Sequence, residues 1–396
     1  MFIAVCGKPS VGKSSFFRAC TLANVAIGSY PFTTIKSSEG VAFVRVECVD
    51  KEFGVTCHPR FGFCADGKRF VPIKLMDIPG LIEGSYQGLG RGNAFLADIA
   101  PADALVHIID VSGSTNEKGE AVQPLSYDPK NDILFLEREI DLWIYGLVKK
   151  GWERFVRKVV QEKANVLKAL AKQLSGLKVT EDLVNEIILA LRLKENIELW
   201  TDEDLKKLAT VIREKTKPMV IAANKIDIPG AEKNLERLRR EFPEHRIIPC
   251  SADAEFALKE AEKKGFIDYV PGTKRFVVKG EVTDQQKQGL EFIQKNVLDV
   301  YGSTGVQEVL DTVVFEVLKM IAIFPGGVGK LEDSEGRVLP DCFLMPPGST
   351  ALDFAYQLHT DIGKGFIRAI DVKTKRAVGK EYPLKQRDVI EIVTRK

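Results

Sequence analysis

Eight residues that directly follow a short apolar stretch constrain the fold of this chain more than any other feature. Residues 2–6 are predicted to form a buried strand, and residues 7–14 read Gly-Lys-Pro-Ser-Val-Gly-Lys-Ser, with the spacing GxxxxGK[ST]. A helix should follow, because apolar residues then recur on one side at helical spacing. Glycines let the backbone N–H groups converge on phosphate oxygens at the positive end of that helix. We therefore predict a phosphate-binding loop that comprises Gly7, Pro9, Ser10, Val11, Gly12, Lys13, Ser14 and Ser15.

A second predicted strand, residues 71–76, ends in Asp77-Ile78-Pro79-Gly80. Lys13 is expected to reach the β- and γ-phosphates, and the Ser14 hydroxyl to bind Mg²⁺. The Asp77 carboxylate would hold the same ion through water, and the Gly80 N–H would contact the γ-phosphate. Thr34 lies between the two motifs, where a loop could bring its hydroxyl to the metal. This arrangement predicts Mg²⁺ ligands at Ser14, Thr34 and Asp77, and a catalytic set of Lys13, Thr34 and Gly80.

A phosphate loop is shared by kinases, ATPases and GTPases, and the base-reading motif distinguishes among them. A third apolar strand, residues 218–223, ends in Asn224-Lys225-Ile226-Asp227. The Asp227 carboxylate can accept both N1–H and the exocyclic amino group of guanine, whereas adenine has no such pair of donors. The aliphatic part of Lys225 would cover the base, and the backbone of Ser251 and Ala252 would contact the guanine O6. The sequence therefore predicts bound GTP or GDP, and a small-molecule kinase is disfavoured.

Together these motifs resemble those of the Obg-like branch of translation-factor GTPases, and within it the YchF family. The similarity runs over nearly the whole chain and includes residues 30–35 and 88–97, while residues 348–355 and 359–366 resemble a TGS domain. It implies an α/β fold: a P-loop GTPase domain with a doubly wound, mostly parallel sheet, a helical insertion and a small ubiquitin-like (β-grasp) C-terminal domain. YchF relatives that favour ATP have lost the Asn-Lys-x-Asp pattern, which this chain retains, so their preference for ATP should not be carried over.

The order of apolar segments gives four expected parts of the chain. Alternating strands and helices predict the first part of the GTPase domain over residues 1–130. Helical periodicity predicts a hairpin or coiled-coil-like insertion over 131–214, and a capping box at Thr201 is expected to open one of its helices. The GTPase domain resumes over 215–320, and the TGS domain occupies 321–396.

Charge is balanced overall but unevenly distributed. The chain has 57 Lys and Arg against 55 Asp and Glu, so no global field draws it to nucleic acid. Residues 149–178 carry nine basic and two acidic side chains, and residues 364–387 carry eight basic and two acidic ones. The first segment is either one arm of an antiparallel hairpin, neutralised by the eight acids of residues 181–204 in the other arm, or a contact with RNA phosphates. The second is either a solvated sheet edge or such a contact. An arm with helices of about 40 residues would project about 60 Å. The resemblance to a TGS domain favours the ribosome or another RNA as partner.

Cysteine usage bears on both compartment and metal binding. Seven cysteines scattered over the chain, with no apparent secretion signal and no long apolar span, are typical of reduced thiols in the cytoplasm. Cys48, Cys57, His58 and Cys64 could together hold zinc, although their spacing lacks two CxxC knuckles. The alternative is that these cysteines are small buried apolar residues.

The step from binding to hydrolysis is the least specified by the sequence. Leu81 occupies the position at which many small GTPases have the glutamine that orients the attacking water, so slow basal hydrolysis is expected. Ser10 replaces an asparagine that in potassium-stimulated relatives helps to hold the cation, which leaves a bound monovalent cation open. The expected function is a slow GTPase that acts as a nucleotide switch on the translation machinery. The alternatives are a constitutive RNA- or ribosome-binding protein with a mainly structural nucleotide site, and an ATPase as in some YchF relatives.

Overall fold

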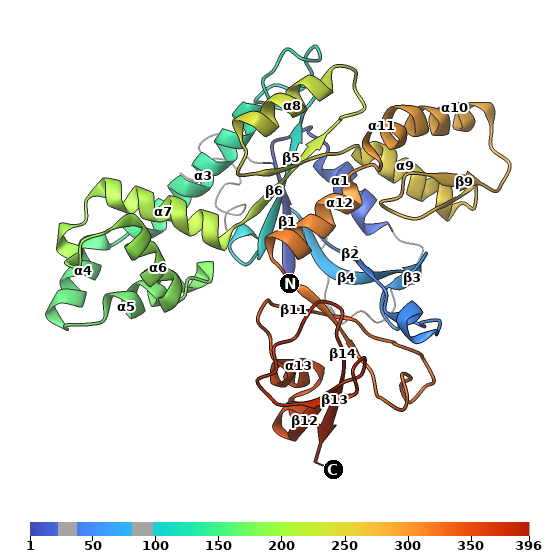
Figure 1. Cartoon of the computed structure of the whole chain (residues 1–396). Helices are drawn as coiled ribbons and strands as arrows, with labels where there is room; N and C mark the ends of the chain where they lie inside the picture. Colours follow the sequence, from blue (N-terminus) through green and yellow to red (C-terminus); the bar gives the residue numbers. More distant parts are fainter. Residues whose placement is uncertain (23–37, 81–97, 396) are drawn as a thin grey trace.

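The main sheet of the protein carries the predicted motifs at its strand ends. A computed structural model describes residues 1–22, 38–80 and 98–395 (Figure 1). In this part of the chain the sheet has seven strands: β1 (Phe2–Cys6), β2 (Glu39–Glu47), β3 (Phe63–Ala65), β4 (Lys68–Asp77), β5 (Ala104–Asp110), β6 (Met219–Asn224) and β7 (Arg246–Pro249). Their order is β2-β4-β1-β5-β6-β7, with β3 paired to β4. Strands β4, β1, β5, β6 and β7 are parallel, whereas β2 and β3 run antiparallel to β4.

Helices cover both faces of this sheet, as expected for strands that are apolar throughout. Every residue of β5 and β6 is buried. On one face pack α1 (Lys13–Thr21), α9 (Ala252–Lys263), α12 (Val306–Asp311) and the π-helical turns of Thr312–Val317. On the other face lie α3 (Lys130–Lys149) and α7 (Asp202–Thr216), and α8 (Ala231–Glu241) packs near β6 and β7. The doubly wound, mostly parallel architecture is therefore confirmed.

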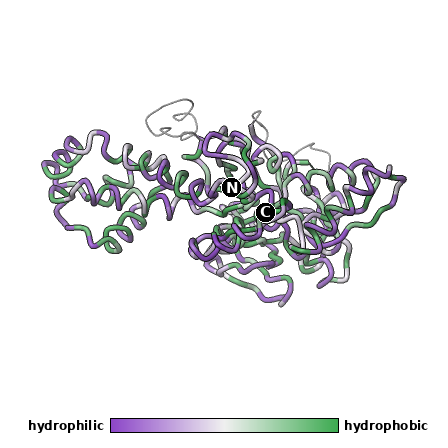
Figure 2. Tube along the Cα trace, turned by 90° about the horizontal axis from the view of Figure 1, so that it is seen from above, coloured by the Kyte–Doolittle hydropathy of each residue, from purple (hydrophilic) through white to green (hydrophobic). Residues whose placement is uncertain are grey.

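The helical insertion forms an arm that projects from the sheet (Figures 1 and 2). Its helices are α3, α4 (Trp152–Gln161), α5 (Val166–Gln173), α6 (Glu181–Leu191) and α7. Helices α3 and α7 run antiparallel, because Arg213 near the end of α7 pairs with Glu137 near the start of α3, and Asp202 pairs with Lys149 at the opposite ends. The predicted capping box at Thr201 is present.

The tip of the arm departs from the expected long hairpin. Helix α3 has 20 residues, so it spans about 30 Å, and a helix of about 40 residues is wrong. The chain turns at Gly151, whose φ is 74°, and α4, α5 and α6 then close a core in which the rings of Trp152 and Trp200 stack with centroids 5.9 Å apart. Within the described residues, no helix is long and apolar enough to cross a lipid bilayer.

Two smaller units complete the chain. The hairpin of β8 (Ile267–Tyr269) and β9 (Phe276–Val278) packs with α9 and with α10 (Asp284–Ile293). A π-helical segment then connects α10 to α11 (Asp299–Tyr301). A separate C-terminal sheet contains β10 (Ile321–Pro325), β11 (Phe343–Met345), β12 (Phe366–Asp371), β13 (Arg376–Val378) and β14 (Val389–Thr394), with α13 (Ala351–Leu358) and α14 (Thr360–Lys364). Its order is β11-β10-β14-β12-β13, and Phe354 of α13 packs against Ile323 and Ile390. This mixed sheet with a packed helix confirms the predicted small C-terminal domain.

Candidate functional site

The predicted phosphate loop is held tightly between β5 and Asn224. Gly7 has a φ of 143°, and a Cβ added there would lie 2.3 Å from the carbonyl oxygen of Ile108. Gly12 has a φ of 95°, and its Cβ would lie 2.2 Å from Nδ2 of Asn224. Neither position tolerates a side chain, because both the backbone angle and the neighbouring atoms exclude one. The two glycines therefore let the loop between β1 and α1 pass close to β5 and Asn224.

Lys13, Ser14 and Asp77 come together at the carboxyl ends of β1 and β4. The Ser14 hydroxyl donates to Oδ2 of Asp77 at 3.2 Å, and Nζ of Lys13 donates to the carbonyl oxygen of Lys8 at 2.6 Å. Burial lowers the pKa of Lys13, and the nearby Asp77 charge partly offsets this lowering. Burial raises the pKa of Asp77. The site thus holds one cation and two hard oxygen donors, the ligand type that Mg²⁺ prefers.

The structure describes only some of the residues that are expected to contact the γ-phosphate and the metal ion. Gly80 lies against the phosphate loop, since a Cβ on Gly80 would come within 3.0 Å of the ring of Pro9. Thr34 and Leu81 lie outside the described residues. The expected roles of both residues stay predictions.

Asn224 joins three segments that are far apart in the sequence. Its Nδ2 donates to the carbonyl oxygen of Val11 at 2.8 Å, and its Oδ1 accepts from the N–H of Ala252 at 3.0 Å. Asn224 is buried at the end of β6, and Ser251 caps the N-terminus of α9 through the N–H of Ala254. The phosphate loop and the Ser251-Ala252 segment are therefore fixed relative to one another by a single side chain.

Lys225 is held in place by a buried acid that the sequence motifs did not include. Its Nζ pairs with Oδ2 of Asp110 at 2.9 Å, and its backbone has a φ of 63°. Burial of Asp110 opposes ionisation, but hydrogen bonds from Ser112, Lys225 and Ser114 outweigh it and lower the pKa of Asp110. The Lys225 side chain is thus tied along the end of β5.

Asp227 follows Lys225 and is only half-buried. No described residue donates a hydrogen bond or forms an ion pair with its carboxylate. Both carboxylate oxygens can therefore act as acceptors, three residues after the Asn224 side chain that binds the phosphate loop.

A buried ion pair beneath the phosphate loop is the main feature of this region that sequence reasoning missed. Nζ of Lys8 lies 2.9 Å from Oδ2 of Asp132, donates to the carbonyl oxygen of Thr115, and stands 3.8 Å from the ring centroid of Tyr127. Lys8 is 3% exposed, and Asp132 lies in the first turn of α3. The pair therefore connects the phosphate loop to the base of the helical arm. Lys8 is part of the phosphate-loop motif of residues 7–14, but nothing in the linear sequence indicates Asp132 as its partner.

The predicted cysteine cluster also differs from expectation. Cys48, Cys57 and Cys64 do come together, but His58 is exposed and does not belong to the cluster. Asp50, two residues after Cys48, takes the fourth position instead. The ligand set that includes His58 is therefore wrong, because the loop turns that side chain away from the sulfur atoms.

Three family descriptions match successive parts of the chain. Residues 2–138 match "50S ribosome-binding GTPase", residues 222–327 match "Obg-like GTPase YGR210-like, G4 motif-containing domain", and residues 333–394 match the TGS domain. The first two matches cover strands on either side of the helical arm, and the third covers most of the C-terminal sheet.

Individual relatives match over nearly their whole length. An uncharacterized GTP-binding protein of Methanocaldococcus jannaschii is 45% identical, over 99% of this chain and 98% of the relative. The crystal structure of a GTP-binding protein from Pyrococcus horikoshii is 39% identical, covers 100% of both chains and has a TM-score of 0.80. The ribosome-binding ATPase YchF of Buchnera aphidicola is 26% identical over 98% of both chains. The YchF GTPase of Schizosaccharomyces pombe shares the fold, with a TM-score of 0.61 at 20% identity over 99% of this chain and 97% of that one.

Proposed function

Since this chain belongs to the Obg-like/YchF family of GTP-binding proteins, we propose that it slowly hydrolyses GTP to GDP and phosphate and acts as a nucleotide switch on the ribosome or another RNA–protein assembly. The observation that carries the proposal is the Asn224-Lys225-Ile226-Asp227 motif at the end of β6, with Asn224 bonded both to Val11 of the phosphate loop and to Ala252. In this proposal the Asp227 carboxylate offers its two acceptors to the base. Adenine has no pair of donors for such a carboxylate.

In this proposal the phosphate loop binds the triphosphate through its backbone N–H groups. Lys13 leaves the Lys8 carbonyl and reaches the β- and γ-phosphates, while Gly80 N–H contacts the γ-phosphate. The Lys225 stem, tied to Asp110, covers one face of the guanine, and the backbone of Ser251 and Ala252 contacts O6. These contacts stabilise negative charge and fix the base, which accounts for binding and for electrostatic stabilisation of the transition state.

The same region fits a magnesium ion. Ser14 Oγ and Asp77 Oδ2 are 3.2 Å apart, which suits one direct ligand and one carboxylate that binds through water. Thr34 is proposed as a further ligand in the triphosphate state. The ion would supply charge neutralisation of the β- and γ-phosphates.

Basal GTP hydrolysis by the isolated chain should be slow. A leucine at position 81 cannot orient the attacking water, and lost alignment alone costs about a hundredfold or more. We expect turnover several orders of magnitude below the roughly 10 s⁻¹ of a typical enzyme. Single-turnover hydrolysis should be measured in sodium buffer, in potassium buffer and with ribosomes added. An increase with either addition would identify where the missing group comes from, whereas fast turnover in sodium alone would contradict the assignment.

The arm carries the surface that best suits RNA. An open groove between α4 and α5 is lined by apolar side chains that include Phe155 and Val159, by four cations and by one acid, Glu162; the cations are Lys150, Arg154, Lys158 and Lys172. None of these four cations forms an ion pair with a described residue, so all four are available to phosphates. The words "ribosome-binding" in the relatives' names agree with this chemistry. A ribosomal partner would place the protein in the cytoplasm.

Ribosome co-sedimentation tests both the partner and the switch. We expect more pelleting with a non-hydrolysable GTP analogue than with GDP or no nucleotide. The double substitution Arg154→Glu and Lys158→Glu should reduce it at least tenfold, whereas the charge-matched control Lys287→Glu and Lys295→Glu, around α10, should not. Equal pelleting in all nucleotide states would favour the constitutive binding protein, and an unaffected double variant would exclude the groove.

A further inference from the structure

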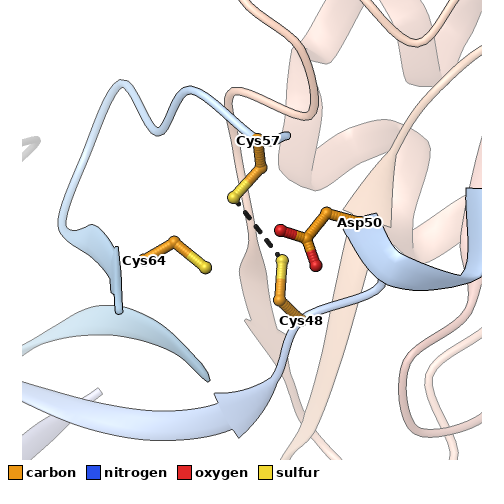
Figure 3. Close-up of side chains that lie close together, drawn as sticks. All are labelled: Cys48, Asp50, Cys57 and Cys64. Carbon is orange, nitrogen blue, oxygen red and sulfur yellow. Dashed lines mark hydrogen bonds between the residues drawn. The ribbon is translucent and has the colours of Figure 1, made fainter. Parts of the chain in front are cut away.

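Four side chains with metal-binding chemistry converge at the edge of the main sheet, away from the nucleotide motifs. Cys48 follows the end of β2, Asp50 lies in the short helical turn Asp50–Phe53, Cys57 lies in the loop that follows, and Cys64 is on β3 (Figure 3). One ligand atom from each residue lies within 4.8 Å of all the others. Cys48, Asp50 and Cys57 are buried and Cys64 is half-buried.

We propose that Cys48, Asp50, Cys57 and Cys64 bind one zinc ion in a tetrahedral structural site. Zinc–sulfur bonds of about 2.3 Å in a tetrahedron place neighbouring ligand atoms about 3.8 Å apart. The Sγ atoms of Cys48 and Cys57 are 3.6 Å apart, close to that edge and far from the roughly 2.05 Å of a disulfide. Three thiolates with one carboxylate suit a borderline-soft ion, whereas Mg²⁺ and Ca²⁺ require oxygen ligands throughout.

The surroundings fit a site of this charge. Three thiolates and a carboxylate carry four negative charges against the two positive charges of the ion. Arg69 is paired with Cys64 across β3 and β4 and is 1% exposed, so a buried cation adjoins the cluster. The Arg69 guanidinium is fixed by the carbonyl oxygens of Leu339 and Pro340. One oxygen of Asp50 accepts the Lys51 N–H at 2.8 Å, which orients the carboxylate as neighbouring groups of metal sites do.

The site would fix the loop that carries much of the contact with the C-terminal sheet. Within residues 48–64, the N–H groups of His58 and Arg60 donate to the carbonyl oxygens of Val338 and Pro340, each at 2.8 Å. Glu52 forms ion pairs with Lys373 and Arg387. Apart from short turns this segment has little regular structure, so a metal that joins its two ends would limit its freedom and hold the C-terminal domain in place.

Metal analysis of the full chain tests the site directly. Protein purified without chelator and without a metal-affinity tag should contain about one zinc per chain by mass spectrometry of the metals. Cys64→Ser and Asp50→Asn should lower the zinc content at least fivefold, whereas Cys342→Ser, a half-buried cysteine outside the cluster, should leave it unchanged. Circular dichroism and nucleotide binding identify any variant that fails to fold.

Cobalt gives a second measurement that does not depend on how the protein was purified. Chelator-treated wild-type protein titrated with Co²⁺ should develop the absorption bands of a tetrahedral thiolate site at one equivalent, and Zn²⁺ should abolish them. Loss of these bands in Cys64→Ser but not in Cys342→Ser would support the proposal. Wild-type protein that binds neither Zn²⁺ nor Co²⁺, that contains iron in place of zinc, or whose zinc persists in Cys64→Ser would overturn it.

Discussion

Replacing Asp227 with asparagine should weaken GTP binding by about 10²- to 10⁴-fold and shift the preference toward xanthine nucleotides. The carboxylate offers two acceptors to the N1–H and amino group of guanine. An asparagine amide offers one acceptor and one donor, and the donor matches the additional carbonyl oxygen of xanthine. The size of the effect follows from replacing two charge-assisted hydrogen bonds by one neutral hydrogen bond, with the amide donor facing a guanine donor in a partly buried site.

Competition with a fluorescent guanine nucleotide measures this shift for GTP and XTP in parallel. Asp253→Asn is the matched control, because it makes the same substitution at an exposed residue in the first turn of α9. The control should bind GTP like the wild type. Unchanged GTP affinity in Asp227→Asn would show that this carboxylate does not read the base.

Removing the Asp132 carboxylate should destabilise the protein by about 3–5 kcal/mol, because it leaves a buried charge without its partner. The Lys8–Asp132 pair is almost fully buried, with Nζ and Oδ2 2.9 Å apart. Burial lowers the pKa of Lys8 and raises that of Asp132, while each charge favours ionisation of the other. Since Lys8 belongs to the phosphate loop, Asp132→Ala should also weaken nucleotide binding.

Urea unfolding of four variants separates the pair from simple loss of packing. The double variant Lys8→Met with Asp132→Asn removes both charges and keeps an acceptor for Tyr127, so it should recover much of the stability lost in Asp132→Ala. Glu153→Ala removes a partner of the exposed Glu153–Arg157 pair and should change stability by less than about 1 kcal/mol. If Asp132→Ala cost no more than Glu153→Ala, the pair would not connect the loop to the arm. Lys8→Met alone gives the cost of leaving the Asp132 carboxylate without its cation.

The parts of the fold that chemistry constrains locally were predictable from sequence. A loop that must wrap phosphates needs glycines at fixed spacing after a strand, and β1, the loop and α1 follow as expected. The base-reading motif likewise stands at the end of β6, because an apolar run buried on both faces must end where polar side chains reach solvent. The capping box at Thr201 also needs only neighbouring residues.

Contacts between distant segments could not be predicted in the same way. Asp132 pairs with Lys8 across 124 positions, and no periodicity marks it as different from other acids at a helix start. A carboxylate two residues after a cysteine has no distinctive spacing, so the sequence does not point to Asp50, whereas His58 directly follows Cys57 and has a side chain that commonly binds zinc. The arm has five helices instead of one long pair, since apolar spacing predicts helices but does not fix where they turn.

Binding of labelled GTP and ATP to the same preparation measures which base the site prefers. Two relatives named as ribosome-binding ATPases are 26% and 23% identical over 98% of this chain, so the family alone does not decide the preference. The Asn224-Lys225-Ile226-Asp227 geometry predicts that GTP binds at least about 100-fold more tightly than ATP. Equal affinity for the two nucleotides, or tighter binding of ATP, would contradict the proposed selection of guanine by Asp227.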